Sequence, residues 1–302
     1  MTKLTRREFV TVSGAAAATA ILPAGANAQA KLPNPLSWTA YDVGSAGYSQ
    51  SVAIGKALKD ALGIVLRVLP GKNDVSRQVP LRQKQVQFSA TGVGASYMAQ
   101  EGVFEFGAKA WGPQDVRMLL AANSDSNLSV GVANDLGIKT IADLKGKRVA
   151  WVVGSPSLNE NVTAILAFGG LGWADVKKVE FPGFGQSWDG LIGGQVDAAF
   201  AQTSSGKCIQ AASSPRGLFW PPLPHGDKAG WARLQAKGPF FQPNIATEGA
   251  TLSKDKPHEG GAYPYPILIC YLDQNADLAY QMTKAMIELF PRYKGASPGI
   301  DG

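Results

Sequence analysis

The chain has 302 residues, of which 45% are hydrophobic and 17% are charged. This composition is that of a globular protein, long enough for one large core or two medium ones, and it excludes an intrinsically disordered chain. The formal net charge of +6 is spread along the sequence, and no run of Lys and Arg is interleaved with aromatic residues, so nucleic-acid binding is not indicated.

The N-terminus has the features of an export signal. Arg6 and Arg7 precede an Ala- and Gly-rich apolar stretch at residues 12–22, and Ala26-Asn27-Ala28 forms a small-x-small cleavage site. The apolar stretch is too short for a transmembrane helix. The paired arginines resemble the twin-arginine signal, which directs the export of folded proteins. We therefore expect residues 1–28 to be removed near Ala28 and the mature protein to lie in the periplasm.

From Leu36 onward, short apolar runs alternate with amphipathic stretches, a pattern typical of βαβ units with parallel strands. Asp74 is a plausible N-cap for the second helix, and Pro80 should bend or end that helix. The first unit is predicted to contain strands at residues 36–41, 64–69, 86–90 and 117–122, and helices at 48–62, after 74 and after 94.

A second unit of the same kind follows. Its predicted strands lie at residues 128–132, 149–153, 179–181 and 196–201. A short helix and a turn are predicted over 141–149, a longer helix from the turn at 154–157 to about Phe168, and another at 186–192. Pro and Gly prevent regular structure over much of residues 215–266. A late strand at 267–272 and an amphipathic helix at 275–290 complete the chain.

This order of elements predicts an α/β protein with two parallel-sheet lobes. The first lobe is expected to combine residues 29–123 with 241–302, and the second lobe to comprise 124–240. The chain then crosses between the lobes twice, near Asn123 and again after about Phe240, and such crossings can act as hinges.

A ligand site is predicted where the carboxyl ends of the strands meet, as in other open parallel sheets. Loops rich in Gly, Ser and Thr occur there, and most of them lead into helices, whose N-termini favour an anion such as a carboxylate. In the alternative interpretation, the serines only cap their helices and Tyr48 is a half-buried aromatic residue. The predicted ligand-binding residues are Ser45, Tyr48, Thr91, Gly92, Ser155, Ser157, Gln202 and Ser204.

Other side chains are assigned to the surface or the core. Arg77 can grip a carboxylate with two hydrogen bonds, but a solvated surface position is expected for it. Trp151 and Trp188 are expected in the core. Cys208 and Cys270 are expected to be small buried residues, and a single disulfide between them is the alternative.

Catalytic and metal sites are not indicated. The two histidines, His225 and His258, have no Cys, His or carboxylate partner at metal-binding spacing. The sequence contains no Gly-x-Ser-x-Gly turn and no phosphate-binding loop. We therefore predict no enzyme activity, no metal and no cofactor.

Three motifs carry a family resemblance. Residues 137–149 begin Gly-Ile and end Ala-Asp-Leu-Lys-Gly-Lys-Arg-Val, residues 154–157 read Gly-Ser-Pro-Ser, and residues 191–198 read Leu-Ile-Gly-Gly-Gln-Val-Asp-Ala. With these motifs the chain resembles the solute receptors of TRAP transporters of the TAXI family, which are grouped with NMT1-like periplasmic proteins.

This resemblance implies a type II periplasmic-binding-protein-like fold without a cofactor. It also implies a receptor that captures a small carboxylate, such as an amino or dicarboxylic acid, and delivers it to integral-membrane TRAP transporter subunits. Three alternatives stay open: a receptor of an ATP-driven (ABC) importer of the taurine, nitrate or thiamine-precursor type, an NMT1-like enzyme, and a ligand-sensing domain without transport. The export signal and the scarcity of histidine argue against the enzyme.

Overall fold

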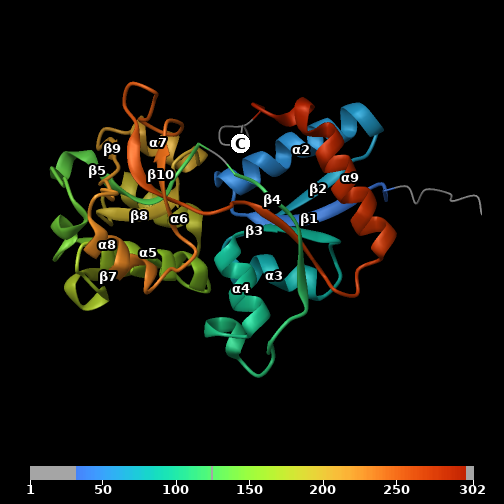
Figure 1. The fold of residues 1–302 in the computed structure, drawn as a ribbon, viewed down its shortest axis with the longest axis horizontal. Helices are drawn as coiled ribbons and strands as arrows, with labels where there is room; N and C mark the ends of the chain where they lie inside the picture. Colours follow the sequence, from blue (N-terminus) through green and yellow to red (C-terminus); the bar gives the residue numbers. More distant parts are fainter. Residues whose placement is uncertain (1–31, 124, 297–302) are drawn as a thin grey trace, which may run out of the picture. The chain divides into compact units, whose positions relative to one another are not determined.

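The computed structural model describes residues 32–123 and 125–296, so the predicted signal at residues 1–28 lies outside the described residues. The described chain is an α/β fold with two lobes, and each lobe is built on a five-stranded sheet that carries helices on both faces (Figure 1). In Figure 1 the first lobe is on the right and the second on the left. The predicted α/β fold with two lobes is confirmed.

The first lobe has the strand order β2-β1-β3-β12-β4. Strands β1, β2 and β3 are parallel, whereas β12 is antiparallel to both of its neighbours. Its strands are β1 (Leu36–Tyr41), β2 (Leu66–Gly71), β3 (Phe88–Thr91), β4 (Val116–Ala121) and β12 (Ile267–Tyr271). Its helices are α2 (Ala46–Leu62), α3 (Asp74–Arg82), α4 (Val93–Glu101), the short η1 (Phe104–Gly107) and α9 (Ala276–Tyr293).

Local sequence signals explain where the first-lobe helices begin and end. The Ser45 side chain accepts a hydrogen bond from the backbone N–H of Tyr48 and so caps α2, and Gly63 ends α2 in the left-handed conformation. Asn73, and not Asp74 as predicted, is the N-cap of α3, because it forms a reciprocal capping box with Ser76. Helix α3 ends at Arg82, two residues after Pro80.

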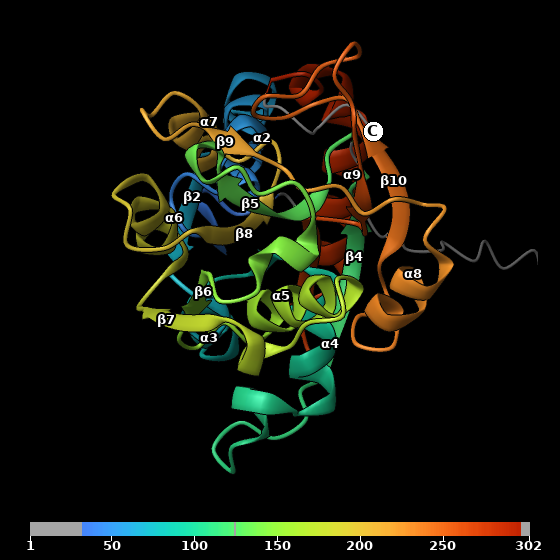
Figure 2. The same ribbon diagram turned by 90° about the vertical axis from the view of Figure 1, so that its left-hand side faces the viewer.

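The second lobe has the strand order β7-β6-β8-β5-β9 (Figure 2), in which β5 is antiparallel to β8 and β9. Its strands are β5 (Leu128–Ala133), β6 (Arg148–Val152), β7 (Lys177–Phe181), β8 (Ala198–Gln202) and β9 (Leu218–Phe219). Its helices are η2 (Asn134–Leu136), η3 (Ile141–Leu144), α5 (Pro156–Phe168), η4 (Trp173–Asp175), α6 (Phe184–Ile192), α7 (Gly206–Ala212) and α8 (Lys228–Gln235).

The expectation of wholly parallel sheets is therefore wrong, since both sheets are mixed. The antiparallel strands, β5 and β12, are the strands that the chain forms directly after crossing from the other lobe. Such a strand does not arrive through a helical crossover within its own sheet, so the rule that makes βαβ units parallel and right-handed does not act on it.

The return crossing lies later than predicted. Strands β10 (Gln242–Ala246) and β11 (His258–Ala262) pair with each other. The backbone N–H of Leu223 donates to the carbonyl of Glu259, which ties β11 to the second lobe. The chain therefore returns to the first lobe between Ala262 and Ile267, and not near residue 240.

The two crossings are hydrogen-bonded to each other. The N–H of Ala122 donates to the carbonyl of Pro266 over 3.2 Å, and the N–H of Tyr265 donates to the carbonyl of Ala122 over 3.1 Å. The polypeptide thus passes between the lobes as a paired double connection.

The two lobes bury their apolar residues differently. The second lobe has one continuous core with Trp188 fully buried, as expected, whereas the first lobe divides its core into three separate clusters. Trp151 is only partly buried and packs edge-on against Trp173. Cys208 and Cys270 are both buried and unpaired, so the interpretation as small buried residues holds and the disulfide does not.

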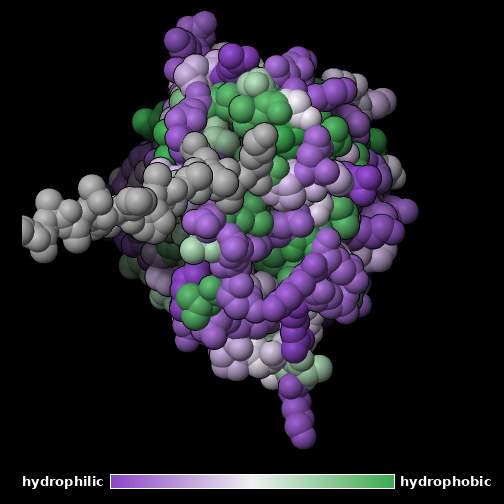
Figure 3. Space-filling model, turned by 90° about the vertical axis from the view of Figure 1, so that its right-hand side faces the viewer, coloured by the Kyte–Doolittle hydropathy of each residue, from purple (hydrophilic) through white to green (hydrophobic). Residues whose placement is uncertain are grey.

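The outer face of the first lobe is mostly polar, with scattered hydrophobic patches (Figure 3). Ile287 on α9 is 62% exposed and Val52 on α2 is 49% exposed. Among the residues that the structure describes, no helix combines the length and the apolar character needed to cross a membrane.

Candidate functional site

The lobes meet where the sequence predicted, at the loops that lead into helices, and they touch directly. Lys207 donates its backbone N–H to the carbonyl of Gly44 over 3.0 Å. The N–H of Ala46, in the first turn of α2, donates to the Ser205 hydroxyl over 3.2 Å. The structure therefore shows the two lobes closed on each other.

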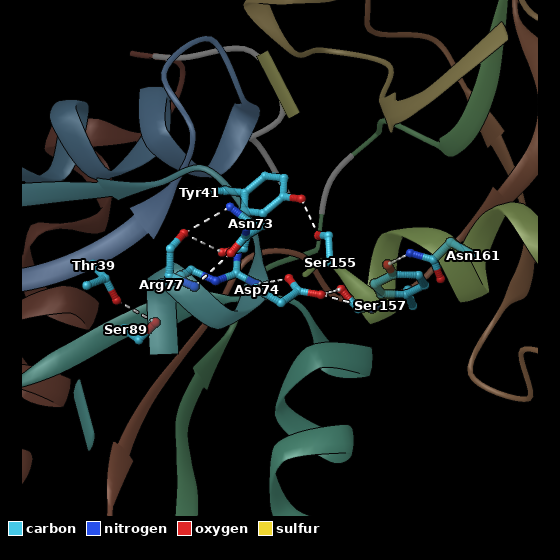
Figure 4. Close-up of polar contacts among 11 residues, drawn as sticks. Thr39, Tyr41, Asn73, Asp74, Arg77, Ser89, Ser155, Ser157 and Asn161 are labelled. Atoms are coloured by element: carbon cyan, nitrogen blue, oxygen red, sulfur yellow. Dashed lines mark hydrogen bonds and ion pairs between the residues drawn. The ribbon is translucent and has the colours of Figure 1, made fainter. Parts of the chain in front are cut away.

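The centre of this interface is the carboxylate of Asp74, which is 2% exposed (Figure 4). Its Oδ2 accepts hydrogen bonds from the backbone N–H of Ser157 at 2.9 Å and from the Ser157 hydroxyl at 2.6 Å. Ser157 is the second residue of α5. The carboxylate of the first lobe thus lies at the N-terminus of a second-lobe helix, where free N–H groups and the helix dipole favour a negative charge.

Arg77 is the counter-ion of Asp74. Its Nη2 donates to Asp74 Oδ1 over 2.7 Å, and the guanidinium carbon lies 4.8 Å from the centre of the Tyr41 ring. Arg77 is 3% exposed, so the expectation of a solvated surface position is wrong. The Asp74 carboxylate and the Tyr41 ring cover its side chain. At the end of β2, a Cβ on Gly71 would lie 2.7 Å from the Arg77 backbone, so the glycine lets α3 pack closely against β2.

A second bridge joins Tyr41, at the end of β1, to Ser155, the N-cap residue of α5. Their hydroxyl oxygens are 2.5 Å apart, and either group can be the donor. Burial, followed by the nearby Asp74 carboxylate, raises the pKa of Tyr41 well above its usual value. The phenol therefore stays protonated and available as a hydrogen-bond donor.

The other second-lobe helices make similar contacts. Gly185, the second residue of α6, donates its backbone N–H to Asp42 Oδ2 over 2.9 Å. The backbone N–H of Phe184, the first residue of α6, donates to the carbonyl of Lys72 over 3.0 Å. The contact from Lys207 to Gly44 completes the set, since Lys207 is the second residue of α7. In α5, α6 and α7, the second helical residue thus donates its N–H to an acceptor of the first lobe.

A cavity of about 40 Å³ lies beside Asp74. It has room for a few water molecules and is far smaller than the roughly 300 Å³ or more of a typical small-molecule site. Its walls combine the buried ion pair with aromatic and apolar side chains. The cavity is lined by Tyr41, Asp74, Arg77, Gly92, Leu128, Ser157, Leu158, Asn161, Phe184, Phe200, Ala201, Gln202, Tyr263 and Tyr265.

Asn161 contributes an unpaired acceptor to this cavity. It is 2% exposed, and its Nδ2 donates to the Tyr263 hydroxyl over 2.7 Å. Its Oδ1 has no hydrogen-bond partner among the residues that the structure describes. A buried amide oxygen without a partner is unfavourable, so this atom is suited to accept a hydrogen bond from a ligand.

Several of the sequence-predicted residues come together here. Gly92, Ser157 and Gln202 line the cavity. Ser155 is fully buried beside it and contacts Tyr41.

The remaining predicted residues do not line the cavity. Ser45 caps α2, and Thr91 pairs with Ile267 inside the first-lobe sheet. Ser204 is 4% exposed, and its hydroxyl has no partner within the described ranges. Tyr48 lies elsewhere, in a surface hollow between α2 and β2.

The sequence analysis missed the acidic and aromatic parts of the site. Tyr41 and Asp42 lie at the end of β1, and Asp74 follows β2 after a short turn. The rule that ligands bind at the carboxyl ends of strands applies to these positions too, but the residues predicted there are mostly glycine, serine and threonine, with Tyr48 and Gln202 beside them. Asn161 lies one turn inside α5, and nothing in the sequence distinguishes it.

The remaining features of the described residues do not compete with this site. No group of three or more His, Cys, Asp or Glu residues is placed to hold a metal ion in the described part of the chain. A larger hollow of about 340 Å³ lies in the first lobe between α2, α9 and the sheet. Its lining is mostly apolar and includes no Asp, Glu, Lys or Arg, so it offers no group to pair with a charged solute.

Solved structures of similar fold include a periplasmic transporter and solute-binding proteins. A protein described as a periplasmic transporter has a TM-score of 0.58 and 15% identity, over 86% of this chain and 85% of its own. The alkanesulfonate-binding protein SsuA from Xanthomonas axonopodis pv. citri, bound to MOPS, has a TM-score of 0.52 and 17% identity, over 88% and 74%. An ancestral arginine-binding protein bound to arginine has a TM-score of 0.50 and 15% identity, over 88% and 97%.

These structural similarities establish the fold, which is that of type II periplasmic solute-binding proteins. A comparison with curated protein sequences found no match. The profile of the NMT1-like family matches residues 43–300, which is most of the chain. The chain belongs to the NMT1-like family.

Proposed function

We propose that this chain is an extracytoplasmic receptor that binds a small solute between its two lobes and delivers it to a membrane transporter. The observation that carries the proposal is the interface at Asp74, where an ion pair, a helix N-terminus and aromatic walls from both lobes surround one cavity. Opening the lobes would expose these groups, and closing them would bury a bound solute, as in other hinged binding proteins. On this proposal the chain is not an enzyme.

The proposed ligand carries a carboxylate. The Asp74 side chain shows that the N-terminus of α5 and Arg77 together satisfy such a group, with two bonds from Ser157 and one from Arg77. Charge-assisted hydrogen bonds of this kind are each worth roughly 1.5–3 kcal/mol. The unpaired Oδ1 of Asn161 would accept a hydrogen bond from a second group on the ligand. An amino or hydroxy acid therefore suits the site.

The proposed transporter is of the TRAP type, in its TAXI family. Support comes from the motifs at residues 137–149, 154–157 and 191–198 that the chain shares with those receptors. The second candidate is the receptor of an ABC importer of the taurine type. The fold similarity to an alkanesulfonate-binding protein favours it, because taurine is itself an alkanesulfonate and a sulfonate would also suit a helix N-terminus.

The proposal includes export to the periplasm. The Arg6-Arg7 pair, the apolar stretch at residues 12–22 and the site ending at Ala28 support a cleaved twin-arginine signal.

A ligand screen followed by two serine substitutions tests the proposed function. Small carboxylates and sulfonates are screened by thermal shift, because a ligand that binds only the folded state raises the melting temperature. Ser157→Ala removes a hydroxyl that would contact the ligand carboxylate, so the affinity for a screened ligand should fall by about tenfold, or 1.4 kcal/mol. Ser155→Ala should have a smaller effect, because Ser155 contacts Tyr41 and does not line the cavity, whereas Ser157 does. Calorimetry measures both affinities.

Ser214→Ala is the matched control, since the Ser214 hydroxyl only bonds a backbone carbonyl in α7. The affinity of this variant should equal that of the wild type. If no small solute stabilises the wild-type protein, the receptor proposal is wrong. If solutes bind but neither Ser155→Ala nor Ser157→Ala weakens binding, the ligand does not use the N-terminus of α5.

A further inference from the structure

We infer that Asp74 is an internal competitor of the ligand, because its carboxylate accepts the hydrogen bonds at the end of α5 that the ligand's anionic group would take. The inference rests on the proposed function. It deepens that function by naming the residue of the same site that sets affinity and selectivity.

The first argument is that the donors are already used. Both donors of Ser157, its N–H and its hydroxyl, bond to Oδ2 of Asp74. A ligand carboxylate at the same N-terminus would stand beside a second negative charge, and two carboxylates that share one buried site repel each other. A ligand anion can therefore occupy the end of α5 only after Asp74 has left it.

The second argument is that opening the lobes frees the donors of Ser157 without breaking the ion pair. Asp74 belongs to the first lobe and Ser157 to the second, so opening the lobes separates these two residues, whereas Arg77 stays beside Asp74 on α3. The Arg77 guanidinium therefore keeps its partner when Asp74 leaves the end of α5. A ligand carboxylate can then accept the hydrogen bonds from Ser157. One carboxylate thus substitutes for another.

The third argument concerns selectivity. With Asp74 in place, Asn161 Oδ1 remains buried without a partner. A simple carboxylate would only reproduce the contacts that Asp74 already makes, so it would gain little by displacing Asp74. A ligand with a hydrogen-bond donor near its carboxylate would reproduce those contacts and also pair Asn161. Asp74 thereby sets a threshold that rejects simple carboxylates and admits amino or hydroxy acids.

The test uses Asp74→Asn, which preserves the size of the side chain and removes its charge. The probes are acetate, which has only the carboxylate, and glycine, which adds an amino group. If Asp74 competes with the ligand, calorimetry should show that both probes bind Asp74→Asn at least about tenfold more tightly than the wild type. Both probes should gain by a similar factor, since each displaces the same carboxylate.

Asp60→Asn is the matched control, because it removes the same charge from an exposed position on α2 and should leave both affinities unchanged. Asp74→Ala provides a second measurement, in which acetate replaces the deleted carboxylate. The melting temperature of Asp74→Ala should rise with acetate concentration more steeply than that of the wild type.

The outcomes are distinct. Unchanged or weaker binding of glycine to Asp74→Asn would show that Asp74 holds the ligand and does not compete with it. That result, or an Asp74→Ala variant that acetate fails to stabilise, overturns the inference while the receptor proposal stands on the solute screen. If the screen also finds no ligand for the wild type, both the proposed function and the inference fail.

Discussion

The two lobes have the same strand plan but differ in charge where they meet. Each sheet places three parallel strands beside one antiparallel strand and an edge strand. Helix starts of both lobes donate backbone N–H groups across the interface, those of α5, α6 and α7 to the first lobe and those of α2 and α3 to the second. The carboxylates that accept from helix starts, Asp74 and Asp42, both belong to the first lobe. The first-lobe acceptors are Asp74, Asp42 and the carbonyls of Lys72 and Gly44.

This difference shows how two lobes with the same strand plan can have complementary surfaces where they meet. Helix N-termini carry partial positive charge, so three of them on one side form a surface that attracts negative groups. The first lobe supplies such groups from the ends of β1 and β2. The two lobes therefore contact each other through their own side chains and backbone. A ligand must then compete with intramolecular bonds as well as with water.

Removing the two interface carboxylates is the strongest way to break this complementarity. The double variant Asp42→Asn, Asp74→Asn eliminates both charges that face helix N-termini. Each charge-assisted bond is worth roughly 1.5–3 kcal/mol, so the balance between closed and open lobes should shift by several kcal/mol. Small-angle scattering of the ligand-free variant should give a larger radius of gyration than that of the wild type.

Asp60→Asn combined with Asp135→Asn is the control, because both carboxylates lie in ion pairs away from the interface. Its radius of gyration should match that of the wild type. If the Asp42 and Asp74 double variant has an unchanged radius, the carboxylates do not hold the lobes together.

The cores give a second comparison, through one buried tryptophan in each lobe. Trp188 Nε1 donates to the carbonyl of Phe200 over 3.0 Å, whereas Trp38 Nε1 is buried and has no partner among the described residues. Trp188→Phe should therefore lower the free energy of unfolding by about 1–3 kcal/mol more than Trp38→Phe, since only the first loses a buried hydrogen bond.

Thermal melting of the two tryptophan variants measures this difference, and the substitutions are matched because each removes the same atoms from a side chain that is at most 1% exposed. Equal losses, or a larger loss for Trp38→Phe, would contradict the expectation that hydrogen bonding distinguishes the two sites.

The sequence predicted the scaffold well because its recognisable motifs are structural. Arg148 lies in one motif and Asp197 in another, and in the structure they form an ion pair with Nη2 and Oδ1 2.6 Å apart. Asp143, in the first motif, accepts hydrogen bonds from the backbone of Lys139 and Thr140 at the start of η3. These bonds stabilise the second lobe and do not reach the cavity.

The site was predicted only in part, for the opposite reason. Small residues in the helix-entry loops pointed to Gly92 and Ser157, since backbone N–H groups at a helix start need no special side chain. The charged pair could not be derived in the same way. Arg77 is buried only because Asp74 and the Tyr41 ring lie beside it, and that arrangement depends on how α3 packs against the second lobe.

The direction of the antiparallel strands could not be predicted from the sequence either. The strand at 267–272 was placed almost correctly, but its orientation is set by the route of the chain between the lobes. Likewise, the Pro- and Gly-rich stretch was expected to lack regular structure over much of its length, yet it contains β9, α8, β10 and β11. Because β10 and β11 belong with the second lobe, the chain returns to the first lobe only after Ala262.

The smallest expected effect concerns pH, and it again separates the lobes, because both histidines lie on the second-lobe side of the return crossing. His258 is 4% exposed, its Nδ1 lies 3.0 Å from Asn127 Nδ2, and its Nε2 lies 3.2 Å from the carbonyl of Pro221. These contacts fit a neutral ring that donates from Nε2 and accepts at Nδ1. A proton on Nδ1 would abolish the bond from Asn127.

Burial accordingly lowers the pKa of His258 from its ordinary value of 6.5. The unfolded chain then binds a proton more readily than the folded one, so stability is fully present above pH 6.5 and falls as the pH drops through 6.5 toward the lower pKa of the folded state. Melting temperatures of the wild type should therefore decrease between about pH 7.5 and pH 5, a range above the ordinary pKa values of carboxylates. His258→Gln should be less stable at pH 7.5 but lose less on acidification. If His258→Gln and the wild type lose the same amount between these pH values, protonation of His258 does not limit the stability of the second lobe.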